Sequence, residues 1–113
     1  MEELVRMEKL NVAIADDNER MVDLLSTLVK GDKELELVGQ AADGQEIYKI
    51  IKEKEPDVVL LDIIMPKMDG ITVMEKLNED PSVRKRPAFI IISQSARNGS
   101  SKMLFDWVPV TIL

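Results

Sequence analysis

The sequence predicts the α/β fold class, with a doubly wound parallel sheet, and three observations support this. Short apolar strands alternate with amphipathic helical segments along most of the chain. Residues 58–61 are continuously apolar, which is typical of a strand buried on both faces. Aspartate or serine directly follows three of the expected strands, where the working groups of such folds lie.

Each element follows from a local pattern. The four expected strands are residues 10–15, 35–38, 58–61 and 88–92. The three helices between them carry apolar residues at helical spacing: Met21, Leu24, Leu25, Leu28 and Val29, then Ile47, Ile50 and Ile51, then Val73, Met74 and Leu77. Gly31 and Pro56 are expected to end the first two helices, Asp43 and Gly44 open the second, and residues 66–70 form a loop.

Composition excludes several kinds of chemistry. The 113 residues suffice for one small domain, and they include neither His nor Cys. Nucleophilic Ser-His and Cys-His sites, disulfides and the usual zinc ligands are therefore excluded. The net charge of −6 disfavours direct binding to nucleic acid. The acidic start differs from a signal peptide and the apolar runs are too short to span a membrane, so we expect a cytoplasmic protein.

Four polar residues stand at strand ends and form the candidate site. Asp16 and Asp17 follow the first expected strand, Asp62 follows the third, and Ser93 follows the fourth. If the first and third strands are neighbours, the three carboxylates meet and repel one another. A hard divalent cation with oxygen ligands, such as Mg²⁺, would offset this repulsion. Asp62 could then act as a nucleophile toward a phosphoryl group, with Ser93 donating a hydrogen bond to it.

Simpler interpretations exist for the individual residues. Asp17 or Asn18 could cap the first helix, and Asp69 with Gly70 could form only a turn. Taken singly, each acid is better explained as a cap or as a solvated residue. Taken together, three acids and a hydroxyl at strand ends favour a functional site. Asp62 is the sharpest case, because a buried charge after an apolar strand is costly unless it has a use.

Five segments carry a resemblance to a known family: residues 12–18 (VAIADDN), 43–46 (DGQE), 55–66 (EPDVVLLDIIMP), 68–70 (MDG) and 91–93 (IIS). They closely resemble the receiver domain of two-component response regulators, which has a flavodoxin-like fold. Within that family the chain is most similar to the stage 0 sporulation protein A of spore-forming bacteria. The resemblance covers roughly residues 7–93, and the block around Asp62 is its most specific part.

The resemblance implies a role for each matching position. Asp62 would be the phosphoacceptor and Ser93 the switch hydroxyl. Asp16 and Asp17, joined by Asp62 and the backbone carbonyl of Ile64, would hold Mg²⁺ or another divalent cation such as Ca²⁺ or Mn²⁺. The phosphodonor would be a histidine kinase or a phosphotransferase bearing a phosphohistidine. The chain would not be an enzyme beyond slow autodephosphorylation, and its pathway would be a phosphorelay that controls sporulation transcription.

The sequence departs from the family after Ser93. We expect residues 1–6 to be an N-terminal extension, residues 7–93 the receiver domain, and residues 94–113 a divergent tail. The family's fourth helix, its Leu-Gly-Ala-x-Tyr-Tyr stretch, its fifth strand, its Lys-Pro pair and its fifth helix are absent as written. The fold is therefore expected to be incomplete, with the fifth strand and fifth helix missing or replaced.

The genetic code suggests a cause for the departure. Asp106, Trp107 and Val108, read two bases later, must encode Leu-Gly, and the residues that follow permit Ala-Gly-Tyr-Tyr. Gln94 to Asn98 likewise permit Ala-Val-Gly-Gln-Glu. We therefore hypothesise a single-base loss in or near the Ser93 codon, with truncation at Leu113. A divergent natural tail is the alternative.

The departure has structural consequences. Loss of the fifth helix should expose apolar surface on the first helix and sheet and leave strand four as a bare edge. The product is then expected to be marginally stable or to self-associate. Five tail residues could pack opportunistically as an edge strand: Phe105, Trp107, Val108, Val110 and Ile112. The family's DNA-binding effector domain would lie beyond Leu113, and the basic run 84–86 is expected to be a solvated loop.

Three other functions stay open at this point. A metal-dependent phosphohydrolase would need a second positioned acid or base near Asp62, and residues 63–65 offer none. A flavin-binding domain would need a phosphate loop after the first strand, where residues 16–19 are acidic instead. An inert truncated fragment is the third alternative.

Overall fold

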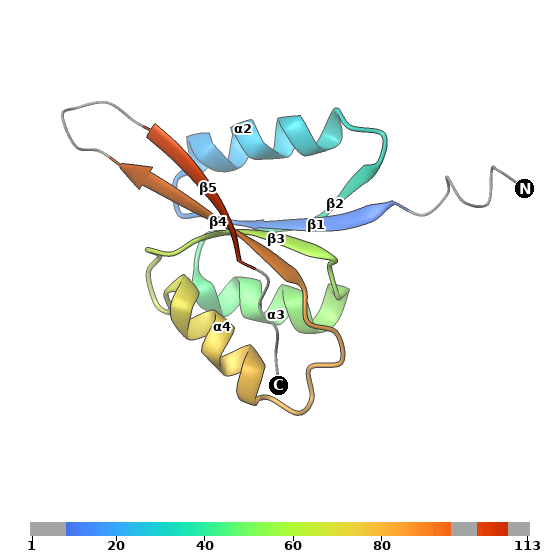
Figure 1. Ribbon diagram of the computed structural model, residues 1–113, viewed down its shortest axis with the longest axis vertical. Helices are drawn as coiled ribbons and strands as arrows, with labels where there is room; N and C mark the ends of the chain where they lie inside the picture. The colour runs from blue at the N-terminus through green and yellow to red at the C-terminus, as the bar shows by residue number, and fades with distance from the viewer. Residues whose placement is uncertain (1–8, 96–101, 109–113) are drawn as a thin grey trace, which may run out of the picture.

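The structure is a computed structural model that describes residues 9–95 and 102–108, with side chains up to Ile92. Strands and helices alternate along it as the sequence predicts (Figure 1). The elements are β1 (Leu10–Ala15), α2 (Glu19–Lys30), β2 (Leu35–Ala41), α3 (Gly44–Lys54), β3 (Val58–Asp62), α4 (Gly70–Glu79), β4 (Ala88–Ser95) and β5 (Lys102–Val108). Among the described helices, none combines the length and the apolar character that crossing a membrane requires.

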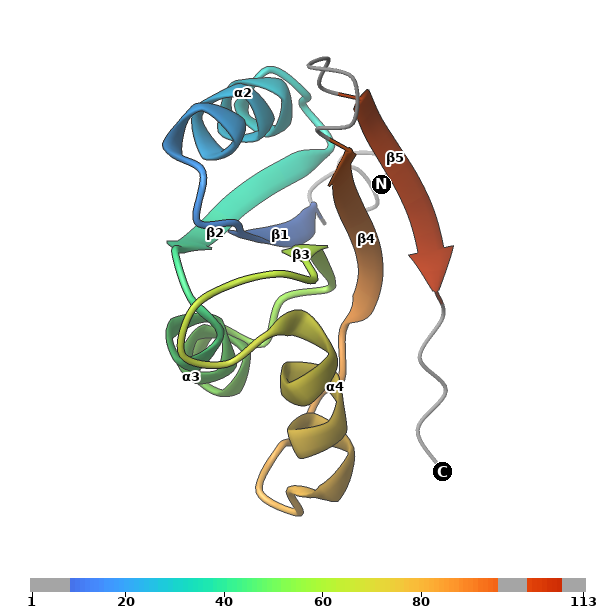
Figure 2. The same ribbon diagram turned by 90° about the vertical axis from the view of Figure 1, so that its left-hand side faces the viewer.

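The sheet has the strand order β2-β1-β3-β4-β5, and its first four strands are parallel. α2 covers one face, and α3 and α4 cover the other (Figure 2). Phe89, Ile47 and Leu61 are fully buried between the sheet and the α3–α4 layer. The predicted α/β class with a doubly wound parallel sheet is therefore confirmed.

Short polar side chains start all three helices. Asn18, Asp43 and Asp69 each accept hydrogen bonds from backbone N–H groups of the following first turn, which would otherwise lack partners. The interpretation of Asn18 as a cap is therefore correct, whereas Asp69, expected to form only a turn with Gly70, caps α4. α3 ends at Glu55, whose φ of 50° lies in the left-handed region, and Pro56 follows it as expected.

One face of β3 is less covered than the sequence predicts. Val59 and Leu61 are fully buried against α3 and α4, whereas Val58 and Leu60 are only half-buried. The prediction that this strand is buried on both faces is therefore wrong in degree, because α2 is the only described helix on the second face (Figure 2). On α2 itself, Leu24 and Leu28 are 46% and 59% exposed, as the expected loss of a covering helix implies.

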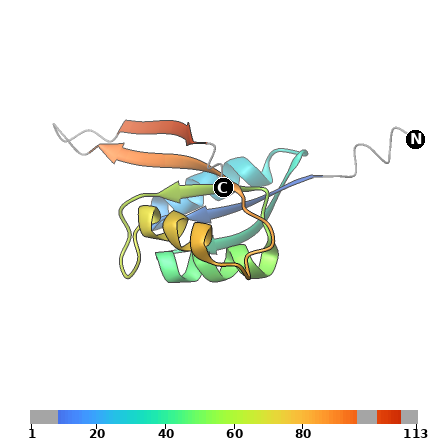
Figure 3. The same cartoon turned by 60° about the horizontal axis from the view of Figure 1, so that its bottom comes forward.

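The edge of β4 differs from its prediction. β4 does not end before Ser93 but continues to Ser95, because β5 pairs with it in antiparallel register from Phe89↔Val108 to Ser95↔Lys102. The prediction of a bare edge is thus wrong, and the alternative of an edge strand in the tail is correct. Figure 3 shows the β4–β5 ribbon running beyond the ends of the parallel strands. After β4 the described residues contain no helix and no parallel strand.

Several expectations fall outside the described residues. They concern the N-terminal extension at residues 1–6, residues 96–98 of the segment with the alternative frame, and the packing of Val110 and Ile112. The boundaries proposed for the receiver region and the tail stay predictions.

Candidate functional site

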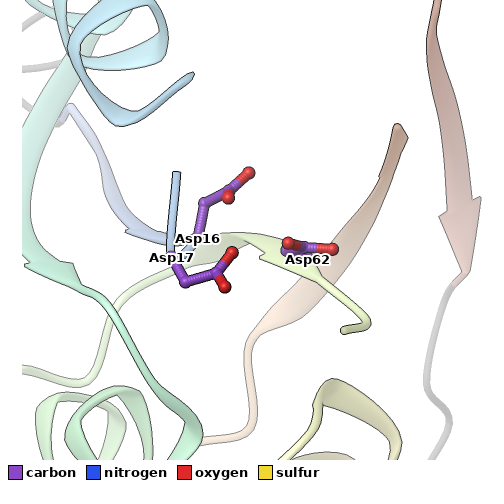
Figure 4. A group of neighbouring side chains, drawn as sticks. All are labelled: Asp16, Asp17 and Asp62. Atoms are coloured by element: carbon purple, nitrogen blue, oxygen red, sulfur yellow. The ribbon is translucent and has the colours of Figure 1, made fainter. Parts of the chain in front are cut away.

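Asp16, Asp17 and Asp62 lie together at the carboxyl end of the sheet (Figure 4). β1 and β3 are neighbours in register, with Ala15 opposite Leu61. The next residue on each strand is an aspartate, so the parallel pairing itself brings Asp16 beside Asp62. Asp17 follows in the connection to α2. The structure therefore juxtaposes the three acids that the sequence singles out.

The three carboxylates are close and partly shielded from water. Each offers an oxygen within 4.8 Å of the others. Asp16 is only 3% exposed, and its Oδ1 accepts a hydrogen bond of 2.9 Å from the amide of Asn18. Asp62 is half-buried, and its Oδ1 accepts one of 3.1 Å from the amide of Ile64. Each of these two carboxylates thus has one backbone donor, and the remaining oxygens are available to the cluster.

Burial and mutual repulsion disfavour the charged forms. Burial first, and then the nearby Asp16 and Asp17 carboxylates, raise the pKa of Asp62 to about 6. Burial likewise raises the pKa of Asp16, against the lowering effect of the Asn18 amide. Negative charge is therefore concentrated at the three carboxylates without enough positively charged partners, which is a common property of functional sites.

The donor set fits a hard divalent cation. Carboxylate oxygens are what Mg²⁺ prefers, and octahedral ligands about 2.1 Å from the metal lie at most about 4.2 Å apart. The oxygens of the cluster all lie within 4.8 Å of one another, slightly more than that maximum, so only a small closing of the side chains would be needed. A bound cation would also remove the repulsion that raises the pKa of Asp62. Asp16, Asp17 and Asp62 are thus the side chains that could hold the metal.

Two further predicted site residues are placed only through their backbone. Ile64 lies two residues beyond Asp62 and donates its amide to that carboxylate, while its side chain is 80% exposed. Ser93 lies inside β4, one position beyond the Asp62↔Ile92 pair, and faces Leu104 in the antiparallel register. The hydroxyl of Ser93 lies outside the described side chains. The roles assigned to both residues stay predictions.

An acidic hollow of about 400 Å³ adjoins the cluster on the side of β2. Asp16 and Asp17 line it together with Glu19, Asp23 and Glu46, whereas Asp62 does not. The hollow thus widens the negative surface beside the site.

No local pattern predicts the framework roles of two residues around the site, Asp57 and Gly44. Asp57 accepts a 2.7 Å hydrogen bond from the amide of Asn11 and pairs with Lys85, so it ties β1 to the segments that lead into β3 and β4. Gly44 packs against the backbone at Met68. Both contacts join segments far apart in the sequence, so no local pattern reports them.

Comparisons with known proteins agree with this geometry. The chain matches the family described as the response regulator receiver domain over residues 12–105. It is similar to the signal receiver domain of the response regulator NarL from Mycobacterium tuberculosis, with 31% identity and a TM-score of 0.69 over 80% of this chain and 69% of that one.

Two other solved structures are similar. One contains CheY with CheX, BeF3 and Mg²⁺ from Borrelia burgdorferi, at 33% identity and a TM-score of 0.66, with coverage of 80% of this chain and 66% of the other. The other is the response regulator domain of Thermotoga maritima CheB, at 27% identity and a TM-score of 0.68, with coverage of 82% and 66%. The chain thus spans slightly less than two thirds of these two relatives. By its matched length and its fold, the chain belongs to the response regulator receiver domain family.

Proposed function

We propose that this chain is a phosphoacceptor, in which Asp62 takes a phosphoryl group from a phosphohistidine on a histidine kinase or phosphotransferase. Receiver domains as a family accept phosphoryl groups from such partners and bind Mg²⁺ at an acidic pocket. In this chain Asp16, Asp17, Asp62 and the backbone carbonyl of Ile64 would hold the cation. Ser93 would donate its hydroxyl to the phosphoryl group.

The observation that carries the proposal is the clustering of three carboxylates with oxygens within 4.8 Å at neighbouring strand ends. Without a cation, burial and repulsion keep the pKa of Asp62 near 6, so a fraction of the nucleophile is protonated at neutral pH. A divalent cation supplies positive charge that favours the carboxylate and screens it from the incoming phosphoryl oxygens. The three carboxylates thereby account both for the repulsion in the metal-free site and for the binding of a cation there.

The proposed transfer is balanced within the two partners. An Asp62 carboxylate oxygen attacks phosphorus, the new O–P bond gives an acyl phosphate, and the P–N bond of the phosphohistidine breaks. The leaving imidazole nitrogen takes the electron pair. Asp16 and Asp17 stay as carboxylates beside the reacting group.

We further propose that the chain is related to the stage 0 sporulation protein A family. It would then act in the cytoplasm, in the control of sporulation transcription. The block at residues 55–66 supports this kinship. The antiparallel return of β5 supports a change of reading frame after Ser93, since the resemblance implies a helix before the next strand. Resequencing the locus tests the frame hypothesis: one inserted base near that codon should restore the family's sequence, and failure to restore it contradicts the hypothesis.

Intact-mass analysis with acetyl phosphate tests the phosphoacceptor assignment. We expect one phosphoryl adduct that needs Mg²⁺ and disappears in Asp62→Asn. Asp57→Asn is a matched control, because it retains an oxygen for the Asn11 amide and lies directly before β3, at the end of the strand away from Asp62. It should keep the adduct.

An adduct that persists in Asp62→Asn contradicts the assignment, as does the absence of any adduct on folded wild-type protein with Mg²⁺. Sustained phosphate release over many turnovers would instead indicate a phosphohydrolase.

A further inference from the structure

We infer that Gly44, in the first turn of α3, is a positioning residue for the loop of residues 63–69, which follows Asp62. The inference rests on the proposed function, because it concerns the cation site that Asp62 and this loop would form. It assigns to α3, which contributes no ligand, the task of setting the loop's position.

The backbone of the loop passes directly over Gly44. A Cβ at this position would lie 1.8 Å from the carbonyl oxygen of Met68 and 2.5 Å from its carbonyl carbon. Gly44 is buried, and its conformation is an ordinary helical one. Glycine is therefore needed here for the close approach of two backbones.

The loop is held on both sides of that contact. Lys67, with a φ of 68°, is in the left-handed region, and its Nζ lies 3.7 Å from Oδ2 of Asp43, the cap of α3. At the loop's end, the amide of Gly70 donates a 2.8 Å hydrogen bond to the carbonyl of Ile63. The unfavourable backbone of Lys67 persists because its neighbours fix it.

The loop connects this contact to the reactive carboxylate. The amide of Ile64 donates to Oδ1 of Asp62, and Ile64 precedes Met68 by four residues. Gly70 returns the chain so closely that a Cβ there would lie 2.8 Å from the carbonyl oxygen of Asp62. Because the loop is short and fixed at both ends, a displacement of the Met68 backbone should therefore also move Ile64 relative to Asp62.

A methyl group on Gly44 would force such a displacement. Real Cβ atoms do not approach closer than 3.0 Å, and only 1.8 Å is present, so one backbone must move by about 1.2 Å. α3 is anchored by Ile47 and Ile51, which are both fully buried. The loop, in which only Met65 is buried, is thus the part that yields.

The expected consequence is a loss of selectivity for Mg²⁺. Mg²⁺ requires near-ideal octahedral geometry, whereas Ca²⁺ accepts longer and more variable distances. A misplaced loop should therefore weaken Mg²⁺ binding more than Ca²⁺ binding. A loss of general stability would weaken both equally.

The test is calorimetric titration of wild type and Gly44→Ala with Mg²⁺ and with Ca²⁺, at one pH and without phosphodonor. We expect Mg²⁺ affinity to fall about tenfold or more, as for other changes outside the ligand shell, while Ca²⁺ affinity falls less. Gly39→Ala is the matched control, since its Cβ would meet the side chain of Ile50, with Cγ2 at 2.9 Å, rather than a backbone. It should leave the ratio of the two affinities unchanged.

An unchanged Mg²⁺ to Ca²⁺ ratio in Gly44→Ala overturns the inference, provided that wild type binds Mg²⁺. If wild type binds neither ion, the proposed function fails first.

Asp43→Asn keeps the test decisive if Gly44→Ala does not fold. It retains a capping oxygen for the Glu46 amide and removes the charge facing Lys67. We expect faster amide hydrogen exchange across residues 63–70 of the metal-free variant and about a twofold fall in the affinity ratio. Exchange and ratio both equal to wild type overturn the inference.

Discussion

Asp57 directly precedes β3 and Asp62 ends it, and their carboxyl groups are in opposite electrostatic situations. Lys85 and the Asn11 amide donate to Asp57, and these hydrogen bonds hold its pKa below the usual range. Burial, with repulsion from the neighbouring acids, raises the pKa of Asp62 to about 6. The charged form of the same residue type is thus stabilised just before β3 and destabilised at the end of β3.

The difference in electrostatic surroundings distinguishes a carboxylate that stabilises the fold from one that belongs to the candidate site. The partners of Asp57 join β1 to the segments that lead into β3 and β4, so its charge contributes to the fold. The neighbours of Asp62 are two more acids, so its charge opposes the fold until a cation arrives. Charge surroundings therefore distinguish a structural carboxylate from a functional one where sequence position alone does not.

Removing the framework carboxylate should have the largest effect on stability. We expect Asp57→Ala to lower the free energy of unfolding by about 2 kcal/mol, because the half-buried amide of Asn11 loses its partner and Lys85 loses its ion pair. Urea denaturation at pH 7 measures this.

The loss should shrink in acid. The lowered pKa of Asp57 means that its contribution is present above the ordinary value of 3.8 and disappears as the pH falls below it. A loss under about 0.5 kcal/mol at pH 7 would contradict the structural role.

Neutralising the site carboxylate should have a smaller effect of the opposite sign. Without divalent cations, Asp62→Asn is expected to raise the free energy of unfolding at pH 7 by about 1 kcal/mol, because it removes a buried charge that Asp16 and Asp17 repel. Metal-free urea denaturation of both proteins measures the difference.

The gain depends on pH in a defined direction. The pKa of Asp62 is raised, so the stability of the protonated wild type is complete below pH 3.8 and is lost as the pH rises through about 6. The two proteins should therefore agree near pH 4, their free energies of unfolding should separate between pH 4 and about 6, and the difference should stay constant above that. A variant less stable than wild type at pH 7 without metal would show that the cluster is not strained.

The smallest effect is expected at the exposed partner of Asp57. Lys85→Met should cost about 0.5 kcal/mol, since the Lys85 side chain is 43% exposed and such ion pairs contribute little. Asp57 keeps the Asn11 amide in this variant. Thermal unfolding in low and high salt checks this prediction, because the stability difference between wild type and Lys85→Met should fall as salt is added. A loss of stability equal to that of Asp57→Ala would contradict it and would assign the whole contribution of Asp57 to its pair with Lys85.

Local signals carry most of the predicted fold. Apolar spacing and the caps at Asn18, Asp43 and Asp69 place the helices within about one residue, because these signals act within a turn. The extension of β4 to Ser95 had no such signal, since it depends on pairing with β5. The half-open face of β3 likewise depends on which helices cover the sheet, and no property of residues 58–61 reports that.

The candidate site likewise has a part that local sequence signals predict and a part that they do not. The proximity of Asp16 and Asp62 is predictable from their positions at strand ends, because neighbouring parallel strands end at one edge of the sheet. The framework around them is not predictable, because Asp57 reaches Asn11 across 46 residues and Gly44 meets Met68 through backbone packing alone. Contacts of this kind follow from the assembled sheet and leave no periodic trace in the sequence.

Mg²⁺-dependent stabilisation of wild type, Asp62→Asn and Asp57→Asn tests the central claim most directly. In wild type, Mg²⁺ at 100 times its dissociation constant should raise the free energy of unfolding by about 2.7 kcal/mol. Asp57→Asn should show the same increase from a lower baseline, and Asp62→Asn should lose most of it. No increase in wild type, or an equal increase in Asp62→Asn, would contradict the assignment of the carboxyl end of β3 as the cation and phosphoryl site.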